Sequence, residues 1–194
     1  MIKVLVFGAT GRMGLEVVKA ISDSKTFKLV AAISSPSSKY LTHDSGVLSC
    51  DRVNEVLISG SLTDISGDVD VAIDFSNPDS SMRCLRYCAD RGIRFISGTT
   101  GFQNHHHKEI QMLSEKTAVC VASNFSKGIA LMSMLVEIAS KTSGDDTQIL
   151  INETHHKDKV DAPSGTAIDL AASIYRASKD SSTDKEVSFS STRS

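Results

Sequence analysis

Short apolar runs alternate with amphipathic segments along the first 125 residues. The runs are rich in Val, Ile, Ala and Phe, as is typical of strands buried on both faces, and comprise IKVLVFG (2–8), KLVAAIS (28–34), VDVAIDFS (69–76), IRFISGTT (93–100) and AVCVASNF (118–125). Apolar residues recur at helical spacing in RMGLEVVKAISDS (12–24), PDSSMRCLRYCADRG (78–92) and KEIQMLSEK (108–116). The alternation predicts an α/β fold with a doubly wound, Rossmann-type parallel sheet.

The pattern changes after Asn124. A long helix (126–144), a strand (148–153), a second helix (167–179) and an alternating strand (187–193) are predicted there. We expect two domains, a dinucleotide-binding domain over 1–125 and a smaller α+β substrate domain over 126–194. Because the last strand coincides with the end of the chain, its sheet looks unfinished, and we expect this domain to be truncated. Residues 34–67 have a weak pattern that allows only a short strand or helix.

Composition narrows the class of protein. The chain has 194 residues, 40% of them hydrophobic, and a net charge of −2, which argues against a nucleic-acid partner held by basic surface. No run approaches the roughly 20 apolar residues that span a bilayer, and the N-terminus leaves no room for a signal peptide. We therefore expect a cytoplasmic protein without a membrane partner. The spacing of Cys50, Cys84, Cys88 and Cys120 predicts plain thiols and no bound metal.

A glycine-rich turn follows the first predicted strand. VFGATGRMG places Gly8, Gly11 and Gly14 at the mouth of the first helix, in a variant of the dinucleotide fingerprint. Glycines permit the tight turn and close backbone approach, and the helix N-terminus offers N–H groups to a pyrophosphate. Alone the motif could be a simple strand-to-helix turn, but its place in an alternating chain favours a dinucleotide site.

The end of the second strand bears on which dinucleotide binds. An acid usually stands there to bind the ribose of NAD, whereas this chain has Ser34 and Ser35. Without a carboxylate, a 2′-phosphate meets no repulsion and could bond to these hydroxyls or to Lys39. We therefore expect NADH or NADPH as cofactor, with NADPH at least tolerated.

Two later strand ends also carry small residues, SGTTG (97–101) and ASNF (122–125). In a doubly wound sheet the carboxyl ends of the strands line the cofactor crevice. Small residues would let a nicotinamide and its ribose lie against the backbone there. Ordinary turn chemistry is an equal alternative for each turn taken singly.

Titratable side chains adjoin a helix start in ETHHKDKVDAPSGTA (153–167). Its adjacent histidines follow a strand and point to opposite faces, so only one readily faces a cleft, and Lys159 could reach the same pocket through a turn. Ser164 is a candidate N-cap, and the N–H groups that follow it favour a carboxylate ligand. The stretch indicates a small acidic substrate that is protonated as it is reduced, with His155 or Lys159 as the donor. A solvated basic loop before a capped helix is the alternative.

Together, GATGRMG, DFS, GTTGF, NFS-x-G and E-x-HH-x-x-K-x-DAPSGTA resemble the 4-hydroxy-tetrahydrodipicolinate reductase family, also called dihydrodipicolinate reductases. The motifs occur in the family's order over nearly the whole chain. The resemblance implies NADH- or NADPH-dependent reduction of 4-hydroxy-tetrahydrodipicolinate to tetrahydrodipicolinate in the diaminopimelate pathway of lysine biosynthesis. It also implies a small dicarboxylate as substrate and a homotetramer, assembled through the second domain.

The resemblance assigns roles to residues. It makes His155 the proton donor and acceptor and Lys159 the second donor. It places the substrate carboxylates against His156, Gly165 and Thr166, to which the helix start adds Ser164. It places the cofactor against Gly8, Ala9, Thr10, Gly11, Arg12, Met13, Gly98, Thr99, Thr100, Ala122, Ser123, Asn124 and Phe125, to which the second strand end adds Ser34 and Ser35.

Three features depart from the family. Ser34 stands in place of the acid, and Lys127 in NFSKG stands where the family usually has an apolar residue. The family also continues well past Ser194 with a glycine-containing segment, further strands and a final helix. The last departure is a second reason to expect a truncated chain.

Other functions fit parts of the sequence. Tyr175 and Lys179 match the Y-x-x-x-K of short-chain dehydrogenases, but the chain lacks the NAG-type turn and the serine that those enzymes need. A non-catalytic dinucleotide-sensing module would bind the cofactor without reducing a substrate. His105–His107 could suggest a metal site, yet consecutive helical side chains diverge, so we expect an exposed first helical turn.

Overall fold

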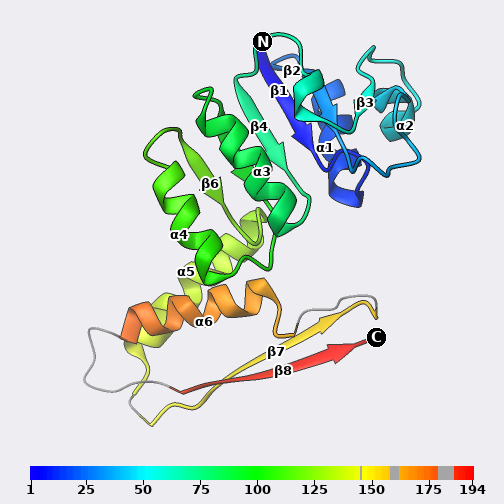
Figure 1. Cartoon of the computed structure of the whole chain (residues 1–194). Helices are drawn as coiled ribbons and strands as arrows, with labels where there is room; N and C mark the ends of the chain where they lie inside the picture. Colours follow the sequence, from blue (N-terminus) through cyan, green and yellow to red (C-terminus); the bar gives the residue numbers. More distant parts are fainter. Residues whose placement is uncertain (145, 158–161, 179–185) are drawn as a thin grey trace. The chain divides into compact units, whose positions relative to one another are not determined.

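The apolar runs of the first part of the chain form the predicted parallel sheet (Figure 1). Its strands are β1 (Ile2–Phe7), β2 (Phe27–Ile33), β3 (Ile58–Ser59), β4 (Val71–Asp74), β5 (Arg94–Ser97) and β6 (Val119–Val121). They lie in the order β3-β2-β1-β4-β5-β6, with parallel pairing throughout. The chain builds outward from β1 on one side and from β4 on the other. This is the strand order of a doubly wound Rossmann-type sheet, and the predicted fold class is confirmed.

The computed structural model describes residues 1–144, 146–157, 162–178 and 186–194. Within this range the chain divides into two compact units, Met1–Ala122 and Ser123–Ser194. Among the helices of the described residues, none combines the length and apolar character needed to cross a membrane.

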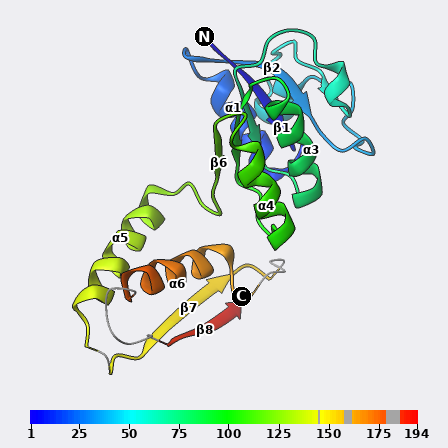
Figure 2. The same ribbon diagram turned by 60° about the vertical axis from the view of Figure 1, so that its left-hand side comes forward.

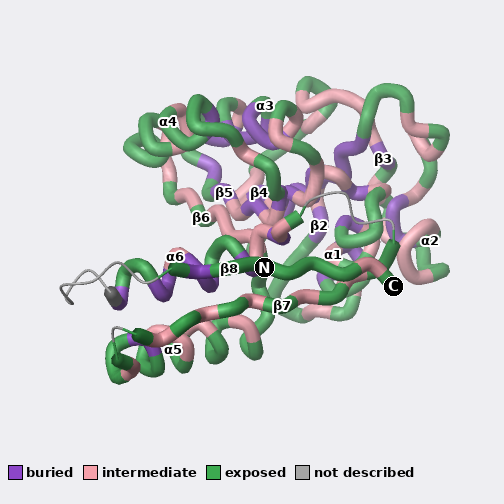
Figure 3. The backbone as a smooth tube through the Cα atoms, turned by 90° about the horizontal axis from the view of Figure 1, so that it is seen from below, coloured by how far each residue is buried: buried purple, intermediate pink, exposed green. Residues whose placement is uncertain are grey.

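Alternate residues of β1 pack into two different cores, which is why the sheet has helices on both faces. Leu5 and Phe7 belong to a cluster with α3 (Pro78–Ala89) and α4 (Asn104–Leu113). Val4 and Val6 belong to a cluster with α1 (Arg12–Ser22). In Figure 3 the buried positions of this unit are concentrated in its strands and along α3. The period of two along a strand thus separates the two helical layers.

Residues 34–67, where the apolar pattern is weak, form α2 (Ser45–Cys50), β3 and a 3-10 helix, η1 (Leu62–Asp64). The Asp44 carboxylate caps α2 by accepting the N–H groups of Gly46 and Val47, at 2.9 and 3.0 Å. It also accepts the N–H groups of Asn54 and Glu55. Bonds between side chain and backbone organise this segment, which is why apolar periodicity does not reveal it.

Helix α4 begins and ends earlier than the predicted 108–116. Its start is fixed by His106, whose Nδ1 accepts the N–H of Gln103 at 3.0 Å. His105–His107 do lie in the first turn, as predicted, but His106 is only 6% exposed, so the prediction of an exposed turn is wrong for this residue. Histidine here takes the role that Glu or Gln has in a capping box. Because its ring bonds back to the backbone of Gln103, the ring lies against the protein and is buried.

The second unit contains α5 (Lys127–Thr142), β7 (Ile149–His155), α6 (Gly165–Ser178) and β8 (Val187–Arg193). Strands β7 and β8 form a parallel pair, and α6 lies along it with α5 beside α6 (Figure 2). Strand β7 runs two residues beyond the predicted 148–153, so that His155 is its last residue.

A small apolar core joins the elements of the second unit. Ala171 and Ile174 of α6 pack on Val187 of β8, with Val136 of α5 and residues of β7 around them. The other apolar residues at helical spacing in α5 are less buried, and Met132 and Leu135 are 47% and 56% exposed. The helix α5 is therefore predicted correctly, but within this unit only part of its apolar face is buried.

Gly14→Ala should destabilise the first unit. A Cβ at this position would lie 2.1 Å from the carbonyl oxygen of Gly8, because α1 starts directly against the preceding loop. We expect the free energy of unfolding, measured by urea denaturation, to fall by about 1–3 kcal/mol.

Gly128→Ala in α5 is the matched control. Its Cβ would lie 3.5 Å from the nearest atom, Ser126 Oγ, and alanine favours a helix over glycine by about 1 kcal/mol. This variant should be neutral or stabilised. Equal stability of the two variants would contradict the close approach at Gly14.

Candidate active site

The loop between β1 and α1 presents backbone at the carboxyl end of the sheet. The N–H groups of Gly8 and Ala9 both donate to the carbonyl of Ile33 at 2.9 Å, which ties the loop to the end of β2. Gly8 has a φ of 81°, and a Cβ there would lie 2.5 Å from the carbonyl oxygen of Phe75. The approach of this loop to the segment after β4 therefore requires glycine.

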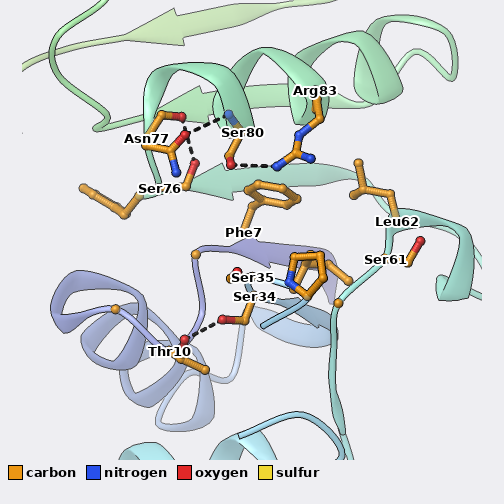
Figure 4. Close-up of a pocket in the computed structure, with 16 residues that line it drawn as sticks. Phe7, Thr10, Ser34, Ser35, Ser61, Leu62, Ser76, Asn77, Ser80 and Arg83 are labelled. Carbon is orange, nitrogen blue, oxygen red and sulfur yellow. Dashed lines mark hydrogen bonds between the residues drawn. The ribbon is translucent and has the colours of Figure 1, made fainter. Parts of the chain in front are cut away.

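A cavity of about 480 Å³ opens beside this loop (Figure 4). Its walls come from the ends of β1 and β2, the segments after β3 and β4, and the start of α3. The polar or glycine residues among its lining include Gly8, Thr10, Gly11, Ser34, Ser35, Asn77, Ser80 and Arg83. The cavity thus lies at the carboxyl ends of the neighbouring strands β1 and β4, whose following helices cover opposite faces of the sheet. This is the switch point at which doubly wound sheets bind ligands.

The wall formed by the end of β2 carries hydroxyls. Ser34 is 8% exposed and shares a hydrogen bond with the hydroxyl of Thr10, drawn in Figure 4. None of the described residues that line the cavity is acidic. Lys39, the other predicted phosphate partner, instead lies with Nζ 5.0 Å from the centroid of the Tyr40 ring. The cavity can therefore receive a phosphate without meeting a carboxylate.

Arg83 is a cavity residue that sequence reasoning missed. It stands on α3, and its guanidinium donates to Ser80 Oγ at 2.8 Å (Figure 4). Asn77 caps the same helix by accepting the N–H of Ser80 at 3.1 Å, and Pro78 stands in its first turn. Its position in the sequence was the available signal. Arg83 lies three residues after Ser80, so the two side chains are neighbours on a helix that starts shortly after a strand.

A buried carboxylate organises the ends of β4 and β5. Asp74 has no exposed surface and accepts the hydroxyls of Ser76, Ser97 and Thr99 at 2.5, 2.6 and 2.9 Å. Thr99 Oγ1 also accepts the N–H of Ser76 at 3.0 Å. These bonds lock the loops after the two strands together. They also turn the Thr99 side chain inward, so this residue can meet a ligand only through its backbone.

The other predicted cofactor residues of the first unit differ in their accessibility. Ala9 is buried, whereas Arg12 and Met13 are exposed at the start of α1. Gly98 packs against the Phe75 ring, whose Cε1 would lie 2.1 Å from a Cβ at that position. Thr100 is exposed, and Ala122 ends the unit. The structure therefore brings only part of the predicted set to the cavity itself.

Glu153 bonds to two predicted site residues of the second unit, the catalytic candidate His155 and the substrate candidate Ser164. Its Oε2 lies 3.0 Å from His155 Nε2 and also accepts the Ser164 hydroxyl. Its Oε1 accepts the Ser164 N–H and the Ser191 hydroxyl, both at 2.8 Å. His155 and the start of α6, predicted to share one site, are thus joined through a carboxylate that sequence reasoning left out. The E-x-H spacing, which puts both side chains on one face of a strand, was the available signal.

Opposing effects act on the pKa of Glu153. Burial alone would raise it, but the hydrogen bonds from Ser164, His155 and Ser191 outweigh burial and lower the pKa from 4.5 to about 2. The carboxylate is therefore ionised at neutral pH. A fixed negative charge stands beside the predicted proton carrier.

Ser164 is the N-cap of α6, as predicted. Its Oγ accepts the N–H of Ala167 at 3.1 Å, and its carbonyl accepts the N–H of Ile168 at 3.0 Å. The first N–H groups of a helix lack acceptors within the helix. Those of Gly165 and Thr166 are therefore available to an anion near this terminus, where the helix dipole favours negative charge.

Two residues predicted to contact the cofactor lie at this same helix start. The Asn124 amide is 3.5 Å from Thr166 Oγ1, and the Ser123 hydroxyl donates to Asp169. Phe125 is 50% exposed beside them in the sequence. The second unit thus brings together residues predicted for cofactor and for substrate.

The remaining predicted residues of this stretch are placed less completely. His156 follows β7 and is exposed. Lys159, predicted as the second donor, and Lys179, of the short-chain dehydrogenase alternative, lie outside the described residues. Within the described ranges, no three His, Cys, Asp or Glu side chains gather as metal ligands, and the four cysteines are free thiols.

Comparison with known proteins gives matches along the whole length. The family model of the N-terminus of dihydrodipicolinate reductase matches residues 2–125, and that of its C-terminus matches residues 128–194. A curated 4-hydroxy-tetrahydrodipicolinate reductase from Acinetobacter baylyi is 39% identical over 169 residues, which are 87% of this chain and 62% of that protein. The chain therefore spans less than two thirds of the length of this relative.

Solved structures include a related protein with a ligand. The dipicolinate-bound dihydrodipicolinate reductase from Paenisporosarcina sp. TG-14 matches with a TM-score of 0.72 and 27% identity, over 100% of this chain and 78% of that one. An aspartate semialdehyde dehydrogenase II from Vibrio cholerae shares the fold alone, with a TM-score of 0.57 and 16% identity over 99% of this chain and 67% of that one.

The lowered pKa of Glu153 predicts a pH dependence of stability. Between pH 4.5 and about 2 the folded protein binds fewer protons at Glu153 than the unfolded chain does. This contribution is therefore complete above pH 4.5 and is lost as the pH falls toward 2, by up to about 3 kcal/mol. Urea denaturation at a series of pH values, compared between the unchanged protein and Glu153→Gln, isolates it. The same slope in both proteins across this window would contradict the assignment.

Proposed function

This chain belongs to the dihydrodipicolinate reductase family, and we propose that it reduces 4-hydroxy-tetrahydrodipicolinate to tetrahydrodipicolinate with NADH or NADPH. The reaction is a step of the diaminopimelate pathway of lysine biosynthesis. The observation that carries the proposal is the Glu153 cluster, which joins the imidazole of His155 to the N-terminus of α6. A proton carrier and an anion-binding terminus in one place suit a dicarboxylate that is protonated during reduction.

The first unit fits a dinucleotide. The cavity lies at the switch point, and its glycine loop brings backbone to the ends of β1 and β4. Gly8, Thr10 and Gly11 would hold the pyrophosphate, and Ser34 and Ser35 the adenosine ribose or its 2′-phosphate. Arg83 adds a cation on the opposite wall. When bound, the reduced nicotinamide supplies a hydride to the substrate ring.

The second unit would bind and protonate the substrate. The N–H groups of Gly165 and Thr166 would receive one carboxylate, with His156 as a further ligand. His155 would give a proton to the ring carbon next to the one that accepts the hydride, and Lys159 would serve as the second donor. This division of labour corresponds to a dinucleotide domain over 1–125 and a substrate domain over 126–194. We further propose that the protein forms a homotetramer and is located in the cytoplasm.

His155→Ala should abolish most turnover and leave cofactor binding intact. Removal of the proton donor is expected to lower kcat by about 100-fold or more. The cavity proposed for the cofactor is lined by residues of the first unit alone, so the Kd for NADPH should not change. Absorbance of NADPH during turnover and fluorescence titration measure the two quantities. Unchanged kcat would contradict the role of His155, whereas an unchanged protein that binds NADPH and turns over no substrate would be a dinucleotide-sensing module.

Tyr175→Phe separates the proposal from a short-chain dehydrogenase. Tyr175 stands on α6 and is 45% exposed, consistent with a residue at the edge of a helix face. Turnover should remain nearly intact. A collapse of kcat in a variant that keeps its circular dichroism spectrum would favour the dehydrogenase alternative.

Ser34→Asp should discriminate between the two cofactors. The new carboxylate would face a cavity without acidic lining and repel a 2′-phosphate, so the Kd for NADPH should rise at least about tenfold while that for NADH changes less. Ser66→Asp adds the same charge at an exposed position away from the cavity and serves as control. Equal weakening of both cofactors by Ser34→Asp would speak against a 2′-phosphate site at Ser34.

A further inference from the structure

The geometry of the second unit fixes which nitrogen of His155 is engaged by protein. Glu153 and His155 lie two residues apart on β7, so that their side chains share one face of the strand. Oε2 of Glu153 lies 3.0 Å from Nε2 of His155, and the two side chains are 13% and 29% exposed. An imidazole held through Nε2 directs Nδ1 away from the carboxylate.

The carboxylate itself is held by donors from two other segments of the chain. Ser164, at the start of α6, donates its N–H to Oε1 and its hydroxyl to Oε2. Ser191, the register partner of Glu153 on β8, donates to Oε1 at 2.8 Å. Three donors besides the imidazole leave the carboxylate no freedom to rotate. The direction in which it accepts a bond from His155 is therefore set by the fold.

We propose that Glu153 is a positioning residue that keeps the Nε2 proton of His155 in place, so that Nδ1 is the atom that exchanges a proton with the substrate. An ionised carboxylate only accepts hydrogen bonds, so Nε2 must carry a hydrogen in both the neutral and the protonated ring. The proton that comes and goes is then the one on Nδ1. This inference rests on the proposed function for its catalytic part but not for its tautomer.

The proton balance is simple. The imidazolium gives its Nδ1 proton to a carbon of the substrate ring and becomes the neutral Nε2–H form, and solvent then restores the Nδ1 proton. Among the residues that the structure describes, the titratable neighbours of the ring in the strand pair are Glu153 on the same strand, Arg193 opposite on β8 and the adjacent His156. The α6 start contributes the neutral Ser164.

The tautomer of His155 can be measured directly. Protein labelled with 15N-histidine gives two-bond 1H–15N correlations that distinguish Nε2–H from Nδ1–H in a neutral ring, and the spectrum of His155→Gln assigns the signal. We expect the neutral ring of the unchanged protein to be in the Nε2–H form. An Nδ1–H form would overturn the proposal, whatever the activity of the protein.

Glu153→Gln sharpens the test because the amide should invert the tautomer. The amide oxygen should remain at the Oε1 position, where the backbone N–H of Ser164 requires an acceptor. The NH₂ group then faces His155 Nε2 and donates to it, which moves the ring proton to Nδ1. Retention of the Nε2–H form in this variant would also overturn the proposal. Should the variant not fold, the spectrum of the unchanged protein still decides.

Kinetics test the catalytic part. Glu153→Gln should lower kcat about 10- to 100-fold with little change in KM, because Nδ1 in the inverted tautomer no longer receives and delivers the proton. Glu137→Gln is the matched control, since its carboxylate bonds to Lys141 on the surface of α5. Unchanged kcat with an inverted tautomer would overturn the positioning role. Unchanged kcat in His155→Ala would instead overturn the proposed function and leave the tautomer assignment standing.

Discussion

A carboxylate withdrawn from water must receive hydrogen bonds, and each unit places one such group near the end of a strand in its part of the proposed site. In the first unit Asp74 collects three hydroxyls and holds the ends of β4 and β5 together. In the second unit Glu153 collects serine and histidine donors and holds the end of β7 against the start of α6. Each carboxylate thus holds together segments that lie far apart in the sequence.

The two carboxylates serve different ends. Asp74 is fully buried and its partners are neutral hydroxyls, so its hydrogen bonds fix the backbone at the ends of β4 and β5. Glu153 is partly exposed, and one of its partners is the ionisable ring of His155. We propose that it positions the proton of that ring. The difference follows from position, since one strand lies inside a six-stranded sheet and the other belongs to a pair.

The sequence predicts the sheet well because buried parallel strands leave an apolar signature and their helices a periodic one. It also predicts the N-cap at Ser164, whose residue type and place before an apolar helix are local signals. It does not reveal α2 or the burial of His106, because the hydrogen bonds that Asp44 and His106 accept from the backbone leave no periodic pattern in the sequence. Glu153 and Arg83 were missed for a related reason. The partners of Glu153, and the walls of the cavity that Arg83 lines, come from segments that are distant in the sequence and meet only in the folded chain.

Ser164 uses one oxygen for two purposes, since it accepts the N–H of Ala167 and donates to Glu153. Aspartate, a good N-cap elsewhere, could accept but would set a second anion against Glu153, and asparagine would divide acceptance and donation between two atoms. Only an alcohol side chain satisfies both neighbours from a single point. The choice of residue at this position is therefore narrower than helix capping alone demands, and a substitution there disturbs the helix and the imidazole at once.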